Sequence, residues 1–193
     1  VIQFWQDREG NDRMSRGRLI APIMATADLQ MMLLRAIGTY RWEMCKTTMG
    51  PDWNNISVSS LTADYTDYVQ FFYKSKELSE EIKEKLAEDM KRFRDDRARF
   101  VNDYAVYMRF ESEGSQRMNR VSRKIFTKHI PFAKEIRERL LKLPSYTEVV
   151  QKSINIRKKK ANELTPRYTK YERENKTLPK ELVETRRYYN MEY

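Results

Sequence analysis

Apolar residues recur at intervals of three and four through most of the chain, and this spacing predicts helices with one buried face. The first predicted helix begins at Thr26, which suits an N-cap, and ends before Gly50 and Pro51, which do not continue a helix. We expect this helix to be largely buried. Its predicted inner line consists of Leu29, Leu33, Ile37, Tyr40 and Met44.

The same spacing predicts a shorter helix over 61–74 and one long helix over 80–113, with Ser79 as the cap of the long one and Gly114 at its end. Acidic and basic residues stand four positions apart along 80–113, and this favours a solvent-exposed face with ion pairs. The apolar line expected to pack consists of Ile82, Leu86, Met90, Phe93, Phe100, Tyr104 and Tyr107.

Segment 115–142 carries an apolar line and a cationic row side by side. A helix capped by Ser115 would pack the line and present the cations beside it. Pro131 either bends this helix or marks the join of two short ones. The apolar line is Met118, Val121, Ile125, His129, Phe132, Ile136 and Leu140, and we interpret His129 as a core or boundary residue. The cationic row is Arg117, Arg120, Lys124 and Lys128, with Arg123 close to it.

A capping box begins the next predicted helix, because Ser145 stands three positions before Glu148. This helix continues to Leu164, and Pro166 and Pro179 are expected in the first turns of two short, tyrosine-rich helices. The predicted organisation is an extended arm over 1–25, a helical bundle over 26–164 and a helical tail over 165–193.

Composition supports an all-α fold, an antiparallel helical bundle with an N-terminal arm and a helical C-terminal tail. Only 5 of 193 residues are Gly and 6 are Pro, which disfavours a turn-rich β architecture. No run of 18 apolar residues is present, so we expect no membrane span. A single Cys and a single His leave no usual ligand set for zinc, and the scattered glycines make no phosphate-binding loop. We therefore expect no enzyme, no metal site, no cofactor and no catalytic residues.

Positive charge is concentrated in the second half of the chain. Residues 1–113 hold 17 Lys and Arg against 19 Asp and Glu, a net charge of −2, whereas residues 114–193 hold 21 against 9, a net charge of +12. This asymmetry favours a polyanionic partner, and we predict non-specific binding to the phosphate backbone of double-stranded DNA. RNA, an acidic protein and lipid headgroups remain alternatives. The candidate contacts are Arg117, Arg120, Arg123, Lys124, Lys128, Arg157, Lys158, Lys159, Lys160, Arg167 and Lys170.

Aromatic residues at both ends of the chain suggest contacts between subunits. Phe4 and Trp5 are costly to leave in water, so the arm is expected to dock on a neighbouring subunit or on its own bundle. Tyr188 and Tyr189 stand beside arginines and suit either a subunit interface or stacking on nucleic acid. We expect a homo-oligomer or an assembly with a closely related, paralogous subunit.

The chain is helical, basic and rich in tyrosine, and it begins at Val1 without Met, from which we expect a processed N-terminus. In this general character it resembles the α-helical major coat proteins of filamentous archaeal viruses. The resemblance implies a structural subunit that wraps double-stranded DNA in a helical polymer and resides in the virion after assembly in the host cytoplasm. The arm departs from this family because it is not strongly basic. The alternative is a protein-only scaffold or an accessory subunit of a large organellar or envelope complex.

Overall fold

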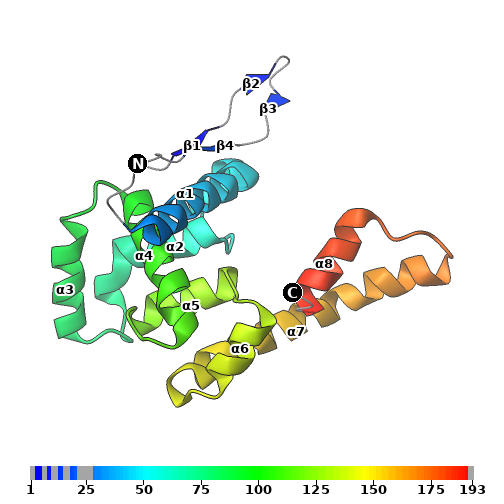
Figure 1. The fold of residues 1–193 in the computed structure, drawn as a ribbon. Helices are drawn as coiled ribbons and strands as arrows, with labels where there is room; N and C mark the ends of the chain where they lie inside the picture. Colours follow the sequence, from blue (N-terminus) through cyan, green and yellow to red (C-terminus); the bar gives the residue numbers. More distant parts are fainter. Residues whose placement is uncertain (1–2, 6–7, 10–12, 15–17, 21–27, 191–193) are drawn as a thin grey trace. The chain divides into compact units, whose positions relative to one another are not determined.

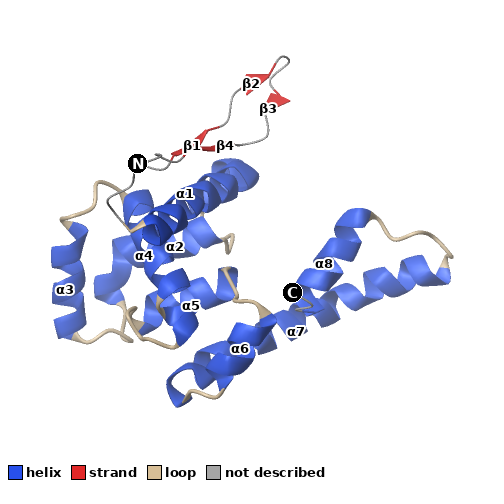
Figure 2. Cartoon of the chain, in the orientation of Figure 1, coloured by secondary structure: helices blue, strands red, loops and turns tan. Residues whose placement is uncertain are grey.

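The computed structural model describes residues 3–5, 8–9, 13–14, 18–20 and 28–190. Within these residues the fold is all-α, as predicted (Figures 1 and 2). The helices are α1 Leu29–Met49, α2 Leu61–Phe71, α3 Glu80–Met90, α4 Asp96–Arg109, α5 Arg120–His129, α6 Lys134–Leu141, α7 Pro144–Arg173 and α8 Lys180–Asn190. Three short 3-10 turns, Gly50–Asn54, Phe72–Lys74 and Glu111–Glu113, follow α1, α2 and α4.

Short strands lie within the predicted arm. Strand β1, Gln3–Trp5, pairs antiparallel with β4, Arg18–Ile20, and β2, Arg8–Glu9, pairs with β3, Arg13–Met14. Phe4 and Trp5 belong to β1, but their side chains, and so their predicted interface role, lie outside what the structure describes.

The described helices form two compact units, the first containing α1 to α5 and the second α6 to α8 together with Ser112–Gly114. The boundary falls at residue 130, within the segment 26–164 that we predicted as one bundle. In the second unit α7 packs against both α6 and α8. Each unit buries its own set of apolar residues.

An aromatic cluster forms the core of the first unit. Phe100 of α4 stacks on Phe126 of α5 with ring centroids 5.4 Å apart, and Tyr65 of α2 meets Phe100 edge-on at 5.2 Å. Trp42 of α1 completes the group, 5.1 Å from Phe100. Each such pair contributes about 0.5–1.5 kcal/mol beyond the area it buries. Four helices are therefore tied together at one point.

Helix α1 does not bury the predicted line. Ile37 is 41% exposed and Met44 is 44% exposed, whereas Gly38 and Trp42 are buried. Gly38 explains the orientation, because a Cβ at this position would lie only 2.9 Å from Tyr104 Cδ1 of α4. The smallest residue therefore determines which face of α1 approaches α4, and the apolar line of α1 faces outward.

The predicted helix over 80–113 is two helices. Asp95 accepts a hydrogen bond from Ala98 N at 2.7 Å and so caps a new N-terminus between α3 and α4. Ser79 caps α3 as predicted, through a bond from Ile82 N. Gly114 has a φ of +89°, a conformation that favours glycine, in the turn that follows α4.

The segment 115–142 is also divided. Helix α5 begins at Arg120, capped by the Asn119 side chain rather than by Ser115, and Pro131 lies in the join between α5 and α6. The most buried face of α5 is one position away from the predicted apolar line, which is only partly buried along this helix. That buried face consists of Ser122, Arg123, Phe126 and Thr127.

Helix α7 differs from its prediction at both ends. It begins at Pro144 with Leu143 as the N-cap residue, so the expected capping box does not define its start. It also runs through Pro166 to Arg173, although we predicted Pro166 in the first turn of a separate helix. A proline inside a helix removes one hydrogen bond, and flanking turns on both sides sustain the helix here. Helix α8 starts directly after Pro179, close to the prediction.

Candidate nucleic-acid interface

Arg123, which we predicted as a DNA contact, is buried. Its guanidinium Nε donates to Glu111 Oε2 at 2.5 Å, and its Nη2 donates to Met118 O at 2.8 Å. Glu111 has no exposed surface, and it also accepts from the backbone N–H groups of Arg117 and Met118 at 2.7 Å each. Arg123 therefore holds the turn before α5 and is not available to a surface ligand.

Two further cations of α5 are paired with acids. Lys124 forms an ion pair with Glu77, and Lys128 Nζ lies 2.6 Å from Asp64 Oδ2. His129 Nε2 also contacts Asp64 Oδ2, at 2.8 Å, which fits the predicted boundary histidine. Burial alone would raise the pKa of Asp64, but the hydrogen bonds from His129 and Lys128 outweigh it and lower that pKa to about 2. The acids thus neutralise much of the predicted row.

The remaining members of the row, Arg117 and Arg120, are exposed. The guanidinium of Arg117 lies over the Phe110 ring, 5.7 Å from its centroid. Three of the five cations predicted in this segment, Arg123, Lys124 and Lys128, are held by acids of the same unit, so the segment presents less charge than its sequence suggests.

In the second unit, Arg157 is the counterpart of Arg123. It is 5% exposed, its Nη2 donates to the Tyr188 hydroxyl at 2.7 Å, and its Nη1 donates to Tyr188 O at 3.1 Å. The guanidinium also lies over the Tyr188 ring at 4.2 Å. Tyr189 meets Tyr188 edge-on at 5.2 Å. Arg157 therefore fastens α8 to α7 and is not available to DNA at the surface. Tyr188 takes part in this contact but is still 40% exposed, so its role at a subunit interface stays a prediction.

The outward side of α7 carries the exposed cations. Of the predicted contacts, Lys158, Lys159, Arg167 and Lys170 are exposed, while Lys160 is exposed but pairs with Glu163 at 3.0 Å. At 3.6 residues per turn, Lys152, Lys159 and Lys170 lie within about 20° of one another around the helix axis, and Arg173 lies about 40–60° to one side of them. We call these four residues the α7 stripe: Lys152, Lys159, Lys170 and Arg173.

The α7 stripe lies largely opposite the buried side of the helix, which contains Val150, Ser153 and Tyr168. In the described part of the chain, none of its members forms an ion pair. Sequence reasoning included Lys159 and Lys170 but missed Lys152 and Arg173. Their spacing of 7, 11 and 3 positions was the available signal, hidden by the more conspicuous run 157–160.

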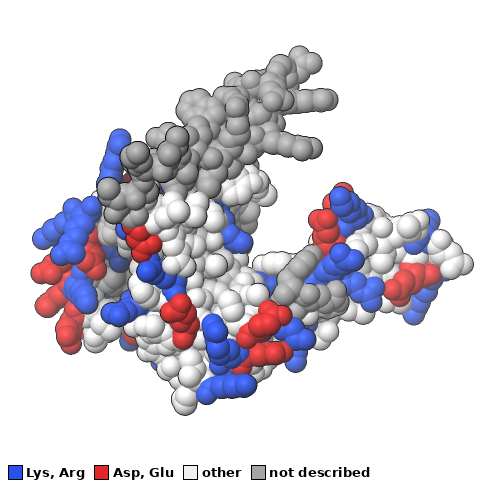
Figure 3. All heavy atoms as spheres, viewed as in Figure 1, with Lys and Arg blue, Asp and Glu red and all other residues white. Residues whose placement is uncertain are grey.

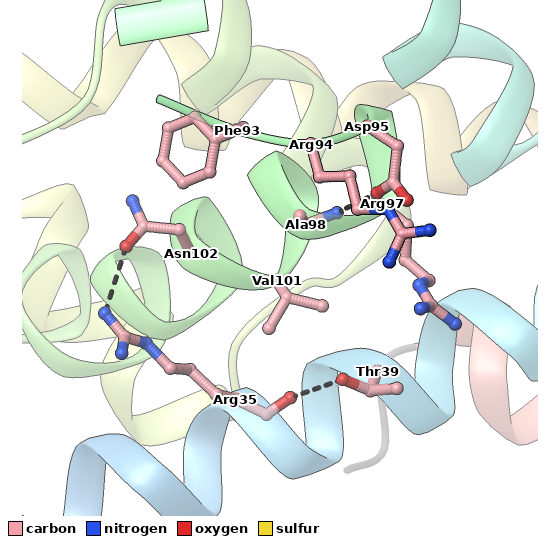
Figure 4. Close-up of a pocket in the computed structure, with 9 residues that line it drawn as sticks. All are labelled: Arg35, Thr39, Phe93, Arg94, Asp95, Arg97, Ala98, Val101 and Asn102. Carbon is pink, nitrogen blue, oxygen red and sulfur yellow. Dashed lines mark hydrogen bonds between the residues drawn. The ribbon is translucent and has the colours of Figure 1, made fainter. Parts of the chain in front are cut away.

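Other basic surface is mixed with acids. Over α3, Lys and Arg alternate with Asp and Glu (Figure 3). A hollow of about 500 Å³ between α1 and α4 is lined by Arg35, Arg94 and Arg97 (Figure 4). Arg97 Nη1, however, donates to Glu43 at 2.8 Å, and Arg35 donates to Asn102 at 3.3 Å. The stripe is the longer and less compensated array of the two.

A family model described as "Domain of unknown function (DUF8509)" matches residues 50–189, and the chain belongs to this family. The match covers α2 to α7 and most of α8, so it spans part of the first unit and most of the second. No curated protein and no solved structure matches the chain. In the described residues, no helix is both long enough and apolar enough to cross a membrane.

Proposed function

We propose that the protein is a structural, non-enzymatic subunit that binds the phosphate backbone of double-stranded DNA through the α7 stripe and assembles with copies of itself or with a closely related chain. The observation that carries this proposal is the alignment of four exposed cations without acidic partners on one side of a 30-residue helix. Packaging of DNA as a coat subunit in a virion, which the family resemblance implies, is the setting that we propose for this binding.

The length of the stripe suits a duplex. At 1.5 Å of rise per residue, Lys152 and Arg173 are about 32 Å apart along the helix, close to the roughly 34 Å of one DNA turn. The segment 152–173 holds eight cations against two acids, a net charge of +6. Four phosphate contacts would give a slope of log K against log salt of about −3.6, because each contact contributes about −0.9.

Contacts of this kind do not read sequence. Lysine acts as a compact point charge, and phosphate contacts fix position without distinguishing bases. We therefore propose equal affinity for duplexes of different sequence, as packaging requires.

Self-assembly is supported by α1. Its outward line includes Leu29, Ile37, Tyr40 and Met44, which are 50, 41, 38 and 44% exposed. An apolar line of this length on a helix suits a contact with another protein surface. The same observation favours the second candidate, a protein-only scaffold in which the α7 stripe lies on an acidic protein.

The test is a titration of labelled duplex DNA with the full chain. We expect Lys152→Glu with Lys159→Glu to weaken binding by about tenfold or more at low salt and to reduce the salt slope by about 1.8. The matched control, Lys76→Glu with Lys91→Glu, changes the charge equally at exposed positions of the first unit and should have a much smaller effect. Equal losses in the two variants would contradict the site, and no binding by the unaltered chain would favour the scaffold.

A further inference from the structure

A cavity of about 350 Å³ opens where α3, α4 and the segment before α5 converge, all within the first unit. Its wall combines apolar side chains, including Leu86 and Val106, with polar ones, including Asn102 and Ser122. Such a mixture of apolar wall and few polar groups, at this volume, is typical of sites for small molecules.

Arg99 is a buried side chain of this cavity whose hydrogen bonds are incomplete. It lines this cavity, yet it is only 4% exposed. Its Nε and Nη1 atoms have no hydrogen-bond partner in the described part of the chain. The nearest acid, Asp103, lies 3.9 Å from Nε, which is too long for a hydrogen bond. A buried guanidinium with unmade hydrogen bonds is costly unless another acceptor completes it.

Asp103 is not free to move toward Arg99 and accept its hydrogen bonds, because the Tyr65 hydroxyl holds its carboxylate. The Tyr65 hydroxyl donates to Asp103 Oδ2 at 2.7 Å, and Tyr65 is itself fully buried in the aromatic core. Burial raises the pKa of Asp103, although the charge of Arg99 opposes this. The carboxylate is thus fixed at a distance from Arg99 by the packing of α2 against α4.

Hydrogen bonds also fix the cavity wall formed by the segment before α5. Asn119 donates to the Tyr68 hydroxyl at 2.7 Å while its carbonyl oxygen caps α5. Glu111 holds the backbone of Arg117 and Met118, as described above. These bonds fix the wall formed by Met118 and Asn119, while Lys85, Gln116 and Arg117 border the cavity with exposed side chains. A ligand would therefore meet a partly preorganised site.

Charge at the cavity is slightly positive. The lining includes Lys85, Arg99 and Arg117 against Asp89 and Asp103, a net charge of +1. Asp89 is further compensated by Arg92, at 3.5 Å. An anion that enters would therefore meet two cations at the rim and a desolvated guanidinium inside, where an ionic hydrogen bond is strongest.

We propose that this cavity binds a small molecule bearing a carboxylate or phosphate group, which accepts hydrogen bonds from Arg99. The apolar wall formed by Leu86 and Val106 holds the remainder of that molecule. This site is separate from the α7 stripe, belongs to the other compact unit and does not rest on the proposed DNA binding.

The experiment measures the thermal unfolding midpoint and calorimetric binding of the full chain with inorganic phosphate and with succinate, at constant ionic strength set with sodium chloride. We expect one of the two anions to raise the midpoint saturably, by about 5 °C at concentrations far above its dissociation constant. A response to phosphate alone identifies a phosphate-bearing ligand, and a response to succinate alone identifies a carboxylate. Lack of saturation with both would overturn the proposal and leave water as the partner of Arg99.

Arg99→Lys keeps the charge but removes the guanidinium, and we expect it to weaken anion binding at least tenfold. The matched control is Arg97→Lys, because Arg97 lies on the same helix but outside this cavity. If Arg99→Lys does not fold, Lys85→Gln with Arg117→Gln at the rim should weaken binding by several-fold. Unchanged binding in the folded variants would place the anion elsewhere and overturn the site. Lys152→Glu with Lys159→Glu should bind the anion normally, which separates this site from DNA binding.

Discussion

The cationic helices α5 and α7 look alike in sequence but use their charges in opposite ways. Helix α5 directs Arg123 inward to Glu111 and joins Lys124 and Lys128 to acids of the same unit. Helix α7 directs one arginine, Arg157, inward and leaves the α7 stripe in solvent. The difference lies in which acids reach the cations: Glu77 and Asp64 pair with the lysines of α5, whereas no acid of the described residues forms an ion pair with the α7 stripe.

This comparison shows that a row of cations in a sequence does not define a surface charge. A lysine that meets a nearby carboxylate gains a hydrogen bond and gives up most of its long-range field. A lysine without such a partner keeps its field and releases counterions when it meets a phosphate. We therefore expect mutations of the α5 cations to change the unfolding free energy most, and mutations of the α7 stripe to change DNA binding most.

The largest stability effect is expected for Arg123→Gln. The substitution leaves Glu111 buried without its charge partner, and loss of one member of a buried pair costs about 3–5 kcal/mol. Chemical denaturation measures the change in unfolding free energy. Lys124→Gln is the control on the same helix and should cost no more than about 1 kcal/mol, because its ion pair is partly exposed. Similar losses from both would remove the distinction between inward and outward cations on α5.

A smaller effect, about 2 kcal/mol, is expected for Arg157→Gln, because it breaks two hydrogen bonds and a ring contact that join α8 to α7. Hydrogen exchange should quicken in α8 while the first unit stays unchanged. Tyr188→Phe removes only the bond to the hydroxyl and should cost about 1 kcal/mol. Unaltered exchange in α8 after Arg157→Gln would show that other contacts hold the helix.

The fold class could be predicted because helical periodicity and low Gly and Pro content are local properties of the sequence. The N-cap at Ser79 and the join near Pro131 could also be predicted from the local sequence. The orientation of α1 was not, because it depends on the close approach of Tyr104 to Gly38, a contact between residues 66 positions apart.

In the candidate site, too, some features follow from the local sequence and others depend on residues distant in the chain. Exposed Lys159 and Lys170 were predictable, since a charged helix position is usually solvated. Burial of Arg123 was not, because it requires Glu111, whose position follows from the turn after α4. The cavity at Arg99 was missed because the break at Asp95 divides the helix predicted over 80–113 and shifts the faces of α4.

Acid should weaken the contacts that Asp64 makes with α5, whereas the Arg157–Tyr188 contact between α7 and α8 contains no carboxylate. The folded pKa of Asp64 is about 2, below its ordinary 3.8, so its ion pairs contribute fully above pH 4 and are lost as pH falls from about 4 to 2. After allowance for solvent screening of this partly exposed group, the loss is about 1 kcal/mol. Unfolding free energies of the unaltered chain and of Asp64→Asn, measured across this range, should converge as pH falls. A constant gap would exclude the ion pair as its cause.

The smallest stability effect is expected for Lys152→Glu with Lys159→Glu, the variant that should most weaken DNA binding. Both side chains are exposed without ion pairs in the described residues, so their replacement should change the unfolding free energy by less than about 0.5 kcal/mol. Chemical denaturation beside the DNA titration tests this separation of stability from binding. If the variant unfolds as readily as Arg123→Gln, the stripe is part of the fold in the same way as α5, and its weaker DNA binding would follow from unfolding rather than from lost phosphate contacts.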